Sequence, residues 1–223
     1  MLIQVLRDIF TPANSVYMLL GILTTLEISI AVVLISVILG SFLAICRNYE
    51  KKALGRLAGA YIEIFRNTPL LLWILVCVFT MRGGTPLIRG SLALVLYTSS
   101  VIAEIVRGGL NAIPKGQFEA AGSQGFSFIQ TLRYIVLPQC FQKIVPSLMS
   151  QIVTTIKDTS FLAQVAITEF FYRSKIVLNS LSQEVSVTSN HVFAIFLFVA
   201  IIYFSINFTL SCLVRYMQRN IAA

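Results

Sequence analysis

The apolar stretch 139–161 carries a row of polar side chains that could bind a hydrophilic solute. The row recurs at steps of four, three, one and three, and its members are Ser147, Gln151, Thr154, Thr155 and Asp158. These steps place the side chains on one face of a helix. Polar groups in hydrocarbon face a bundle interior or a water-filled cavity. Serine and threonine could instead bond to their own helix, but an unpaired carboxylate at Asp158 would be costly. We therefore predict a polar pathway lined by Gln151, Thr154, Thr155 and Asp158.

A second polar group interrupts the apolar stretch 57–80. Glu63 and Arg66 stand three residues apart, and the tripeptide 67–69, Asn-Thr-Pro, follows directly. Its proline has no N–H to donate, so it breaks the helical ladder beside a charge. Broken membrane helices of this kind line transport sites, whereas a Glu–Arg pair beside a packing kink needs no such role. The sequence leaves both interpretations open. The first assigns to the pathway Arg66, Asn67, Thr68 and Pro69.

No set of residues in the sequence is typical of an enzyme. His191 is the only histidine, and neither a nucleophile nor a ligand cluster accompanies it. The four cysteines lack metal-binding spacing, and the chain has no G-x-x-x-x-G-K-[ST] loop for ATP phosphates. Glu104 and Arg107 have the spacing of an ordinary helix-surface salt bridge. Glu27 and His191 each stand alone and are interpreted as structural. We expect no catalytic residue, no metal and no cofactor in this chain.

The elements that position these residues are membrane helices. Hydrophobic residues make up 57% of the chain and charged residues 12%, whereas soluble proteins carry about 25% charged residues. A membrane helix needs about 20 largely apolar residues. The predicted spans lie at about 16–46, 57–80, 90–106, 139–161 and 191–214. The first is long enough to remain as an anchor, and we expect no cleavable signal peptide before it.

Basic residues set the predicted orientation. The net charge of +8 comes from residues that lie mostly between the apolar stretches, where they orient a chain in the bilayer. Arg47, Lys51, Lys52 and Arg56 follow the first span at once, which places that end in the cytoplasm. With five spans, ten Lys and Arg residues fall inside, five outside and two within spans. We predict an all-α membrane protein of one domain, 1–223, with its N-terminus outside and its C-terminus in the cytoplasm.

The cytoplasmic loop 107–138 contains signals for two short helices. Gly125 has no Cβ and permits a sharp bend between them. Ser127 and Gln130 have the spacing of a capping box for the second helix. The predicted apolar face of that helix comprises Ile129, Leu132 and Val136. These features alone favour an amphipathic helix that lies on the membrane surface.

A longer pattern gives this loop a specific function. Glu119-Ala120-Ala121 is followed after three residues by Gly125, and after nine more by Ile135 and then Leu137-Pro138. At every fixed position this resembles the "EAA loop" in the membrane subunits of bacterial ATP-driven importers. The resemblance implies a coupling helix that sits in a groove of a separate ATPase subunit. The residues expected at that contact are Gln117, Phe118, Glu119, Ala120, Ala121 and Gly125.

Four further segments resemble permeases for polar amino acids, the histidine/glutamine/glutamate permease family. The segments are 63–70, 103–109, 113–117 and 157–160. The resemblance implies a type I importer fold in the bacterial cytoplasmic (inner) membrane, with a periplasmic N-terminus. It also implies a second permease subunit, identical or homologous, and an extracytoplasmic binding protein that delivers the amino acid. Two ATPase subunits would carry the ATP and Mg.

The substrate class follows from the charges along the predicted pathway. In the family the fourth span contributes to the amino acid site, and Gln151 and Asp158 occupy the matching face. A neutral amide at Gln151, with Arg66 and Lys157 as candidate cations, favours glutamate, glutamine or aspartate. The alternative is a cationic amino acid, such as arginine, histidine or lysine. An ion-coupled secondary transporter is less favoured, because such folds commonly show paired repeats.

Overall fold

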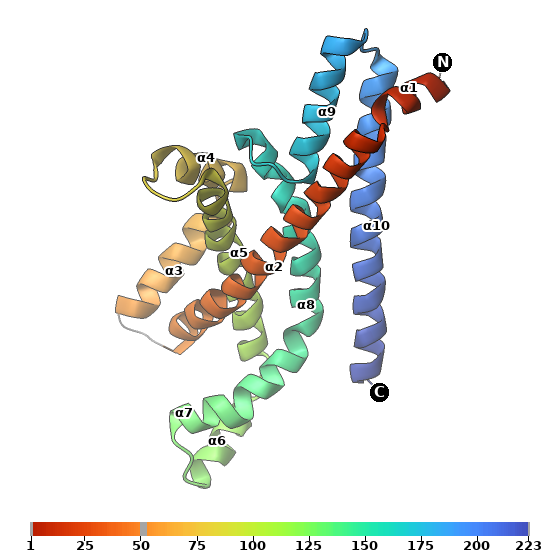
Figure 1. Ribbon diagram of the computed structural model, residues 1–223. Coiled ribbons are helices and arrows are strands. Elements are labelled where there is room, and N and C mark those ends of the chain that lie inside the picture. The colour runs from red at the N-terminus through yellow and green to blue at the C-terminus, as the bar shows by residue number, and fades with distance from the viewer. Residues whose placement is uncertain (1, 50–52, 223) are drawn as a thin grey trace. The chain divides into compact units, whose positions relative to one another are not determined.

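The computed structural model describes residues 2–49 and 53–222, and these residues form helices and no strand (Figure 1). The elements are α1 (Leu2–Ile9), α2 (Pro12–Tyr49), α3 (Ala53–Arg66), α4 (Leu70–Thr80), α5 (Pro86–Asn111), α6 (Lys115–Ser123), α7 (Phe128–Thr131), the π-helix η1 (Leu132–Val136), α8 (Leu137–Asp158), the 3-10 helix η2 (Thr159–Val165), α9 (Phe170–Glu184) and α10 (Ser189–Ala222). The predicted all-α class is confirmed. Lys51 and Lys52, which support the predicted orientation, lie outside the described residues.

Several of these helices could cross a membrane. In the described ranges, α2, α5 and α10 have the length and hydropathy of a span. The bent pair α3 and α4 passes the same test together, as a broken span or a re-entrant loop. The 22 residues of α8 give it the length, and it carries the predicted polar row. The number of five spans and their orientation remain predictions.

The break between α3 and α4 falls where Pro69 predicts it. The first helix ends at Arg66 and the second begins at Leu70. The hydroxyl of Thr68 donates to the carbonyl of Ile64 at 2.7 Å and lies 3.5 Å from that of Phe65. The Phe65 carbonyl is the one that Pro69 leaves without an N–H donor. The threonine therefore supplies a local polar partner at the break.

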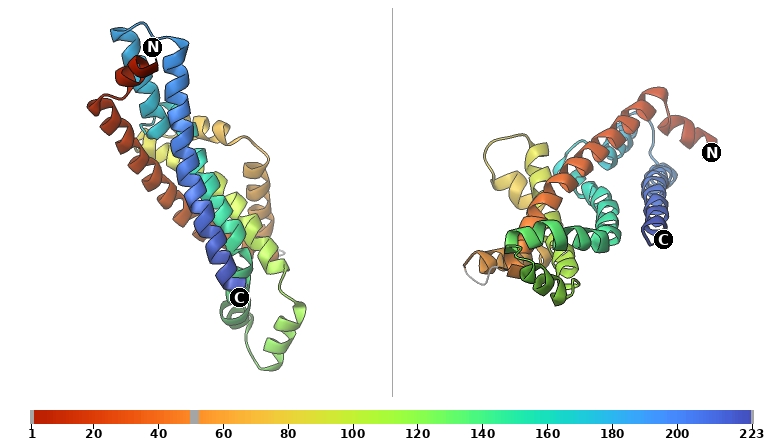
Figure 2. Two further views of the ribbon diagram at one scale, coloured as in Figure 1. Left: turned by 90° about the vertical axis from the view of Figure 1, so that its right-hand side faces the viewer. Right: turned by 90° about the horizontal axis from the view of Figure 1, so that it is seen from below.

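The helices fall into two compact units. Unit 1 comprises Met1–Val32, Leu71–Leu94 and Val153–Ala223, and unit 2 comprises Val33–Leu70 and Val95–Ile152. In unit 1, α9 and α10 lie side by side and α1 packs against both (Figures 1 and 2). Their shared core contains Val5, Ile9, Met18, Phe170, Val177, Leu181, Ile195 and Val199. Gly21 lets α2 approach α9 closely, because a Cβ there would lie 2.7 Å from the Cα of Phe170.

Unit 2 packs α2, α3, α5 and α8 around a core that also includes both ends of the loop 107–138. The buried residues are Leu43, Ala44, Cys46, Ala58, Ile62, Ile102, Ala103, Val106, Leu110, Ile113, Leu132, Val136, Cys140 and Ile144. Two glycines permit a close approach between helices, Gly40 between α2 and α5 and Gly109 between α5 and α8. A Cβ on Gly40 would lie 2.7 Å from the carbonyl oxygen of Ser99, and one on Gly109 would collide with Ile144. The loop therefore emerges from a tightly packed base.

Candidate functional site

The predicted two-helix loop is present between α5 and α8. The first helix, α6, ends at Ser123, and Gly125 follows with φ +82°, a conformation that glycine adopts without a steric cost. Ser127 then caps α7. The backbone N–H of Ser127 donates to Oε1 of Gln130 at 2.8 Å, and the N–H of Gln130 donates back to Oγ of Ser127 at 3.4 Å. Both halves of the predicted capping box are therefore formed.

The chain departs from the predicted helical period directly after α7. Leu132–Val136 form a π-helix, in which each turn holds more residues than an α-turn. Leu132 and Val136 are buried, but the side chain of Ile129 is 73% exposed. Ile129 therefore does not share the buried side of Leu132 and Val136, and the predicted shared face is wrong for Ile129.

The candidate coupling residues divide between two sides of α6. Ala121 is buried, and Phe118 is half-buried with its ring against Tyr49 of α2. Those two side chains attach the helix to its own unit. The exposed candidates are Gln117, Glu119, Ala120 and, at the bend, Gly125. Gln117 also contacts the rest of unit 2, because its Oε1 accepts from Nε2 of Gln139 on α8 at 3.1 Å. This second set is the surface that a partner could contact.

Glu104 of α5 gathers three arginines in unit 2. Its Oε1 accepts from Nη1 of Arg47 at 2.9 Å and from Nε of Arg107 at 3.0 Å. Its Oε2 accepts from Nη2 of Arg107 at 2.8 Å and lies 3.3 Å from Nη1 of Arg66. Arg47 also donates to Oε1 of Glu63 at 2.7 Å. The predicted salt bridge between Glu104 and Arg107 is therefore formed, and it is part of a network that joins α2, α3 and α5.

We expect Glu104→Ala to destabilise the chain far more than Glu63→Ala. The Glu104 side chain is 16% exposed and the Glu63 side chain 63%. Removing Glu104 leaves three partly exposed arginines without their shared partner. The cost lies between that of an exposed pair and that of a buried pair, at about 2 kcal/mol, or a Tm lower by about 4–8 °C. An exposed pair contributes at most about 1 kcal/mol. Thermal unfolding of the detergent-solubilised variants would measure both effects, and equal shifts would contradict the central role of Glu104.

The predicted pathway residues lie in both units. Of the row on α8, Thr155 is buried, whereas Gln151, Thr154 and Asp158 are partly buried. Gln151, Thr154 and Thr155 also have interaction partners within the protein. Arg66 and the tripeptide 67–69 belong to unit 2 with Gln151, whereas the other three belong to unit 1. The assignment of these residues to a pathway remains a prediction.

Glu169 is a buried polar residue that the sequence interpretation missed. Its carboxylate caps α9 by accepting from the N–H groups of Phe171 at 3.0 Å and Tyr172 at 2.8 Å. It also accepts from the hydroxyls of Thr25 at 3.3 Å and Tyr203 at 3.1 Å. Burial raises the pKa of Glu169, and these four donors oppose that shift. The available signal was an acidic residue just before a helix, where the helix dipole favours negative charge.

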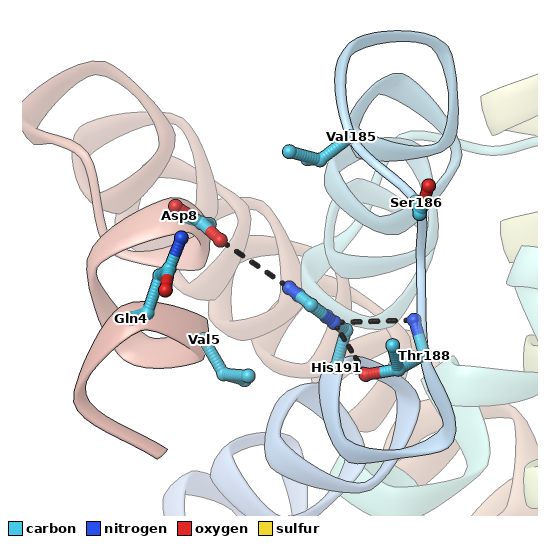
Figure 3. A pocket seen from close by; sticks show the side chains of 7 residues that line it. All are labelled: Gln4, Val5, Asp8, Val185, Ser186, Thr188 and His191. Carbon is cyan, nitrogen blue, oxygen red and sulfur yellow. Dashed lines mark hydrogen bonds and ion pairs between the residues drawn. The ribbon is translucent and has the colours of Figure 1, made fainter. Parts of the chain in front are cut away.

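A cavity of about 350 Å³ lies beside α1 and the turn between α9 and α10 (Figure 3). Its lining residues are Gln4, Val5, Asp8, Val185, Ser186, Thr188 and His191. The backbone N–H of Thr188 donates to Nδ1 of His191 at 3.2 Å, so neutral His191 carries its proton on Nε2, 3.5 Å from Asp8. The prediction that His191 stands alone is therefore wrong. Asp8 is distant in sequence, and folding brings α1 against α10.

Comparison with known proteins identifies the family. Residues 36–223 match the family described as "binding-protein-dependent transport system inner membrane component". The chain belongs to this family. The permease is 34% identical over 202 residues to a "probable glutamine ABC transporter permease protein" of Bacillus subtilis, which covers 89% of this chain and 90% of that one. It is 29% identical over 218 residues to a glutamate/aspartate import permease protein of Escherichia coli, which covers 92% and 94%.

Solved structures of ABC transporters have the same fold as the permease. The crystal structure of an amino acid ABC transporter with histidines matches with a TM-score of 0.79 and 27% identity, over 92% of this chain and 94% of that one. The MetNI methionine ABC transporter in an inward-facing conformation matches with a TM-score of 0.73 at 17% identity, over 93% and 99%, and supports the fold alone. The permease therefore has the type I ABC permease fold.

Membership in the family confirms the general function predicted from the EAA loop. The permease is a transporter subunit and not an enzyme, and ATP hydrolysis belongs to a separate ATPase subunit. As a component of an ABC importer, it works in a membrane with an ATPase and with a binding protein. The family assignment does not depend on the individual site residues.

Proposed function

We propose that this permease forms the translocation pathway for a polar amino acid of the glutamine, glutamate and aspartate class. The observation that carries this proposal is the similarity along nearly the whole chain to permeases named for glutamine and for glutamate/aspartate. The charges support the same class, because the candidate pathway combines one carboxylate, at Asp158, with a neutral amide at Gln151. A cationic amino acid would favour a second acid beside Asp158. It is the alternative substrate class.

In this proposal, Asp158 binds the ammonium group that every amino acid carries. Charge-assisted hydrogen bonds between a carboxylate and an ammonium group are about twice as strong as neutral ones. Gln151, Thr154 and Thr155 offer amide and hydroxyl groups along the same row of α8. The break in the second span supplies Arg66 and the polar tripeptide 67–69, and Arg66 and Lys157 are the candidate partners for a substrate carboxylate. The pathway then needs no cofactor in this chain.

The exposed side of α6 couples the permease to ATP hydrolysis. We place Gln117, Glu119 and Ala120 in a groove of the ATPase, with Gly125 setting the bend behind them. Phe118 and Ala121 fix the helix to unit 2 and so pass its movement into the permease. The exposure of Gln117, Glu119 and Ala120 and the burial of Ala121 support this division. ATP and Mg would bind only to the ATPase.

The complete importer would contain two permease subunits, two ATPase subunits and an extracytoplasmic binding protein. Each permease would be one transmembrane domain over 1–223, with five spans, a periplasmic N-terminus and a cytoplasmic C-terminus, in the bacterial inner membrane. The basic residues near the ends of the first and last spans support this orientation. The second permease would be identical or homologous.

Reconstitution of the complete complex in proteoliposomes tests the proposal. With the ATPase and the binding protein present, uptake of labelled glutamine or glutamate should require ATP. Unlabelled glutamine, glutamate or aspartate should compete, whereas arginine, histidine and lysine should not. Competition by the cationic amino acids alone would establish the alternative substrate class. Uptake driven by an ion gradient without the ATPase would contradict the importer mechanism.

A further inference from the structure

One side chain outside the loop contacts both helices of the loop, α6 and α7. Tyr49 is the last residue of α2, and its ring lies 6.1 Å from that of Phe118 on α6 and 5.2 Å from that of Phe128 on α7, measured between ring centroids. The contact with Phe128 is edge-to-face, at 73° between the ring planes. Such contacts depend on the relative orientation of the two rings. Tyr49 is therefore sensitive to the position of both α6 and α7.

The same helical turn of α2 makes the ion pairs with α3 and α5. Arg47 precedes Tyr49 by two residues, which places the two side chains about 200° apart around the helix. Nη1 of Arg47 donates to Glu104 at 2.9 Å and Nη2 donates to Glu63 at 2.7 Å. The end of α2 thus contacts the loop on one side and the charged network on the other.

These contacts lie within unit 2 and form a continuous path. The path runs from the rings of Phe118 and Phe128 to Tyr49, through the last turn of α2 to Arg47, and then to Glu104 on α5. Tyr49 and Phe118 also pack against the buried core of the unit. The backbone connects the loop directly only to α5 and α8, so α2 and α3 receive its movement through side-chain contacts.

We propose that Tyr49 is a positioning residue that transmits displacement of the coupling loop to α2 and, through Arg47, to α3 and α5. This inference rests on the proposed docking of α6 to the ATPase. If the ATPase moves α6, the ring of Tyr49 must follow Phe118 and Phe128 or lose both contacts. Removing the ring then leaves ATPase binding intact and weakens the link between ATP hydrolysis and the movement of α2 and α3.

The experiment compares Tyr49→Ala and Tyr49→Phe in the reconstituted complex with the ATPase and the binding protein. The matched control is Phe42→Ala, which removes an aromatic ring from the same helix at a side chain that is 56% exposed. The measured quantities are co-purification of the ATPase, the rate of ATP hydrolysis and the number of glutamine molecules imported per ATP. We expect Tyr49→Ala, which removes both aromatic pairs, to retain the ATPase and to import about three- to tenfold less glutamine per ATP. Tyr49→Phe and Phe42→Ala should match the unchanged protein.

The outcomes separate this inference from the proposed function. A normal import ratio in Tyr49→Ala overturns the inference and leaves the proposed function intact, as does a loss of ATPase binding confined to that variant. Failure of the unchanged permease to bind the ATPase overturns the proposed function itself. If Tyr49→Ala does not accumulate, Phe128→Ala removes the partner ring instead and should lower the same ratio. Phe128→Ala with a normal ratio overturns the inference.

Discussion

Replacing Gly125 with aspartate should abolish amino acid uptake while the permease still accumulates in the membrane. Gly125 has φ +82°. Apart from its two neighbours in the chain, no residue has an atom within 4 Å of the position that a Cβ would take. The substitution therefore makes no internal clash, but it strains the bend between α6 and α7. It also adds a negative charge to the exposed surface of the loop, which already carries Glu119. Both effects act on the surface that we propose to contact the ATPase.

The matched control for this substitution is Gly83→Asp. Gly83 has φ +91° and an equally open environment, but it precedes α5 and lies outside the coupling loop. The backbone strain is therefore similar, and only the position differs. ATP-dependent uptake in proteoliposomes should be lost in Gly125→Asp and retained in Gly83→Asp. Equal activity of the two variants would count against a specific role for the bend.

Replacing Asp158 with alanine should lower uptake of glutamine or glutamate by about 10- to 100-fold. This range corresponds to the loss of one hydrogen bond to a charged group, about 1.5–3 kcal/mol. Asp158→Asn, which keeps the shape and removes the charge, should show most of the same loss. Co-purification of the ATPase should not change, because the substitution lies outside the loop.

Concentration-dependent uptake measurements would separate weaker substrate binding from a lower maximal rate for each Asp158 variant. Glu27→Ala serves as the control, since it removes an exposed acid from α2, a helix that has the length and hydropathy of a span. The proposed site predicts altered kinetics or selectivity in the Asp158 variants alone. Unchanged kinetics in Asp158→Ala would eliminate this residue from the pathway.

The elements that the sequence predicted well depend on short-range signals. The capping box joins Ser127 to a residue three positions away, and the bend at Gly125 needs only a missing Cβ. The break between α3 and α4 likewise follows from Pro69 alone. Hydropathy over about 20 residues indicates the long helices in the same way. Each of these features is determined by neighbouring residues and needs no knowledge of the tertiary structure.

The features that the sequence did not predict depend on distant residues or on small backbone changes. Glu104 has an evident partner one turn away, but Arg47 reaches it from another helix. His191 has a near partner in Thr188, but its acidic partner, Asp8, is distant in sequence and arrives with α1. The π-turn that follows α7 changes the helical period from Leu132 onward. Pattern analysis assumes one constant period and therefore cannot detect that change.

The most direct test of the central mechanism is a cross-link from the exposed side of α6. Glu119 is replaced by cysteine in a chain whose exposed Cys212 is changed to serine, and the other described free cysteines are buried. In membrane vesicles with the complete importer, the mechanism predicts that Glu119→Cys cross-links to the ATPase. The yield should change with ATP, and an impermeant thiol reagent should reach the position only from the cytoplasmic side. Labelling from the outer side, or a complex that transports amino acids but never forms this cross-link, would contradict the mechanism.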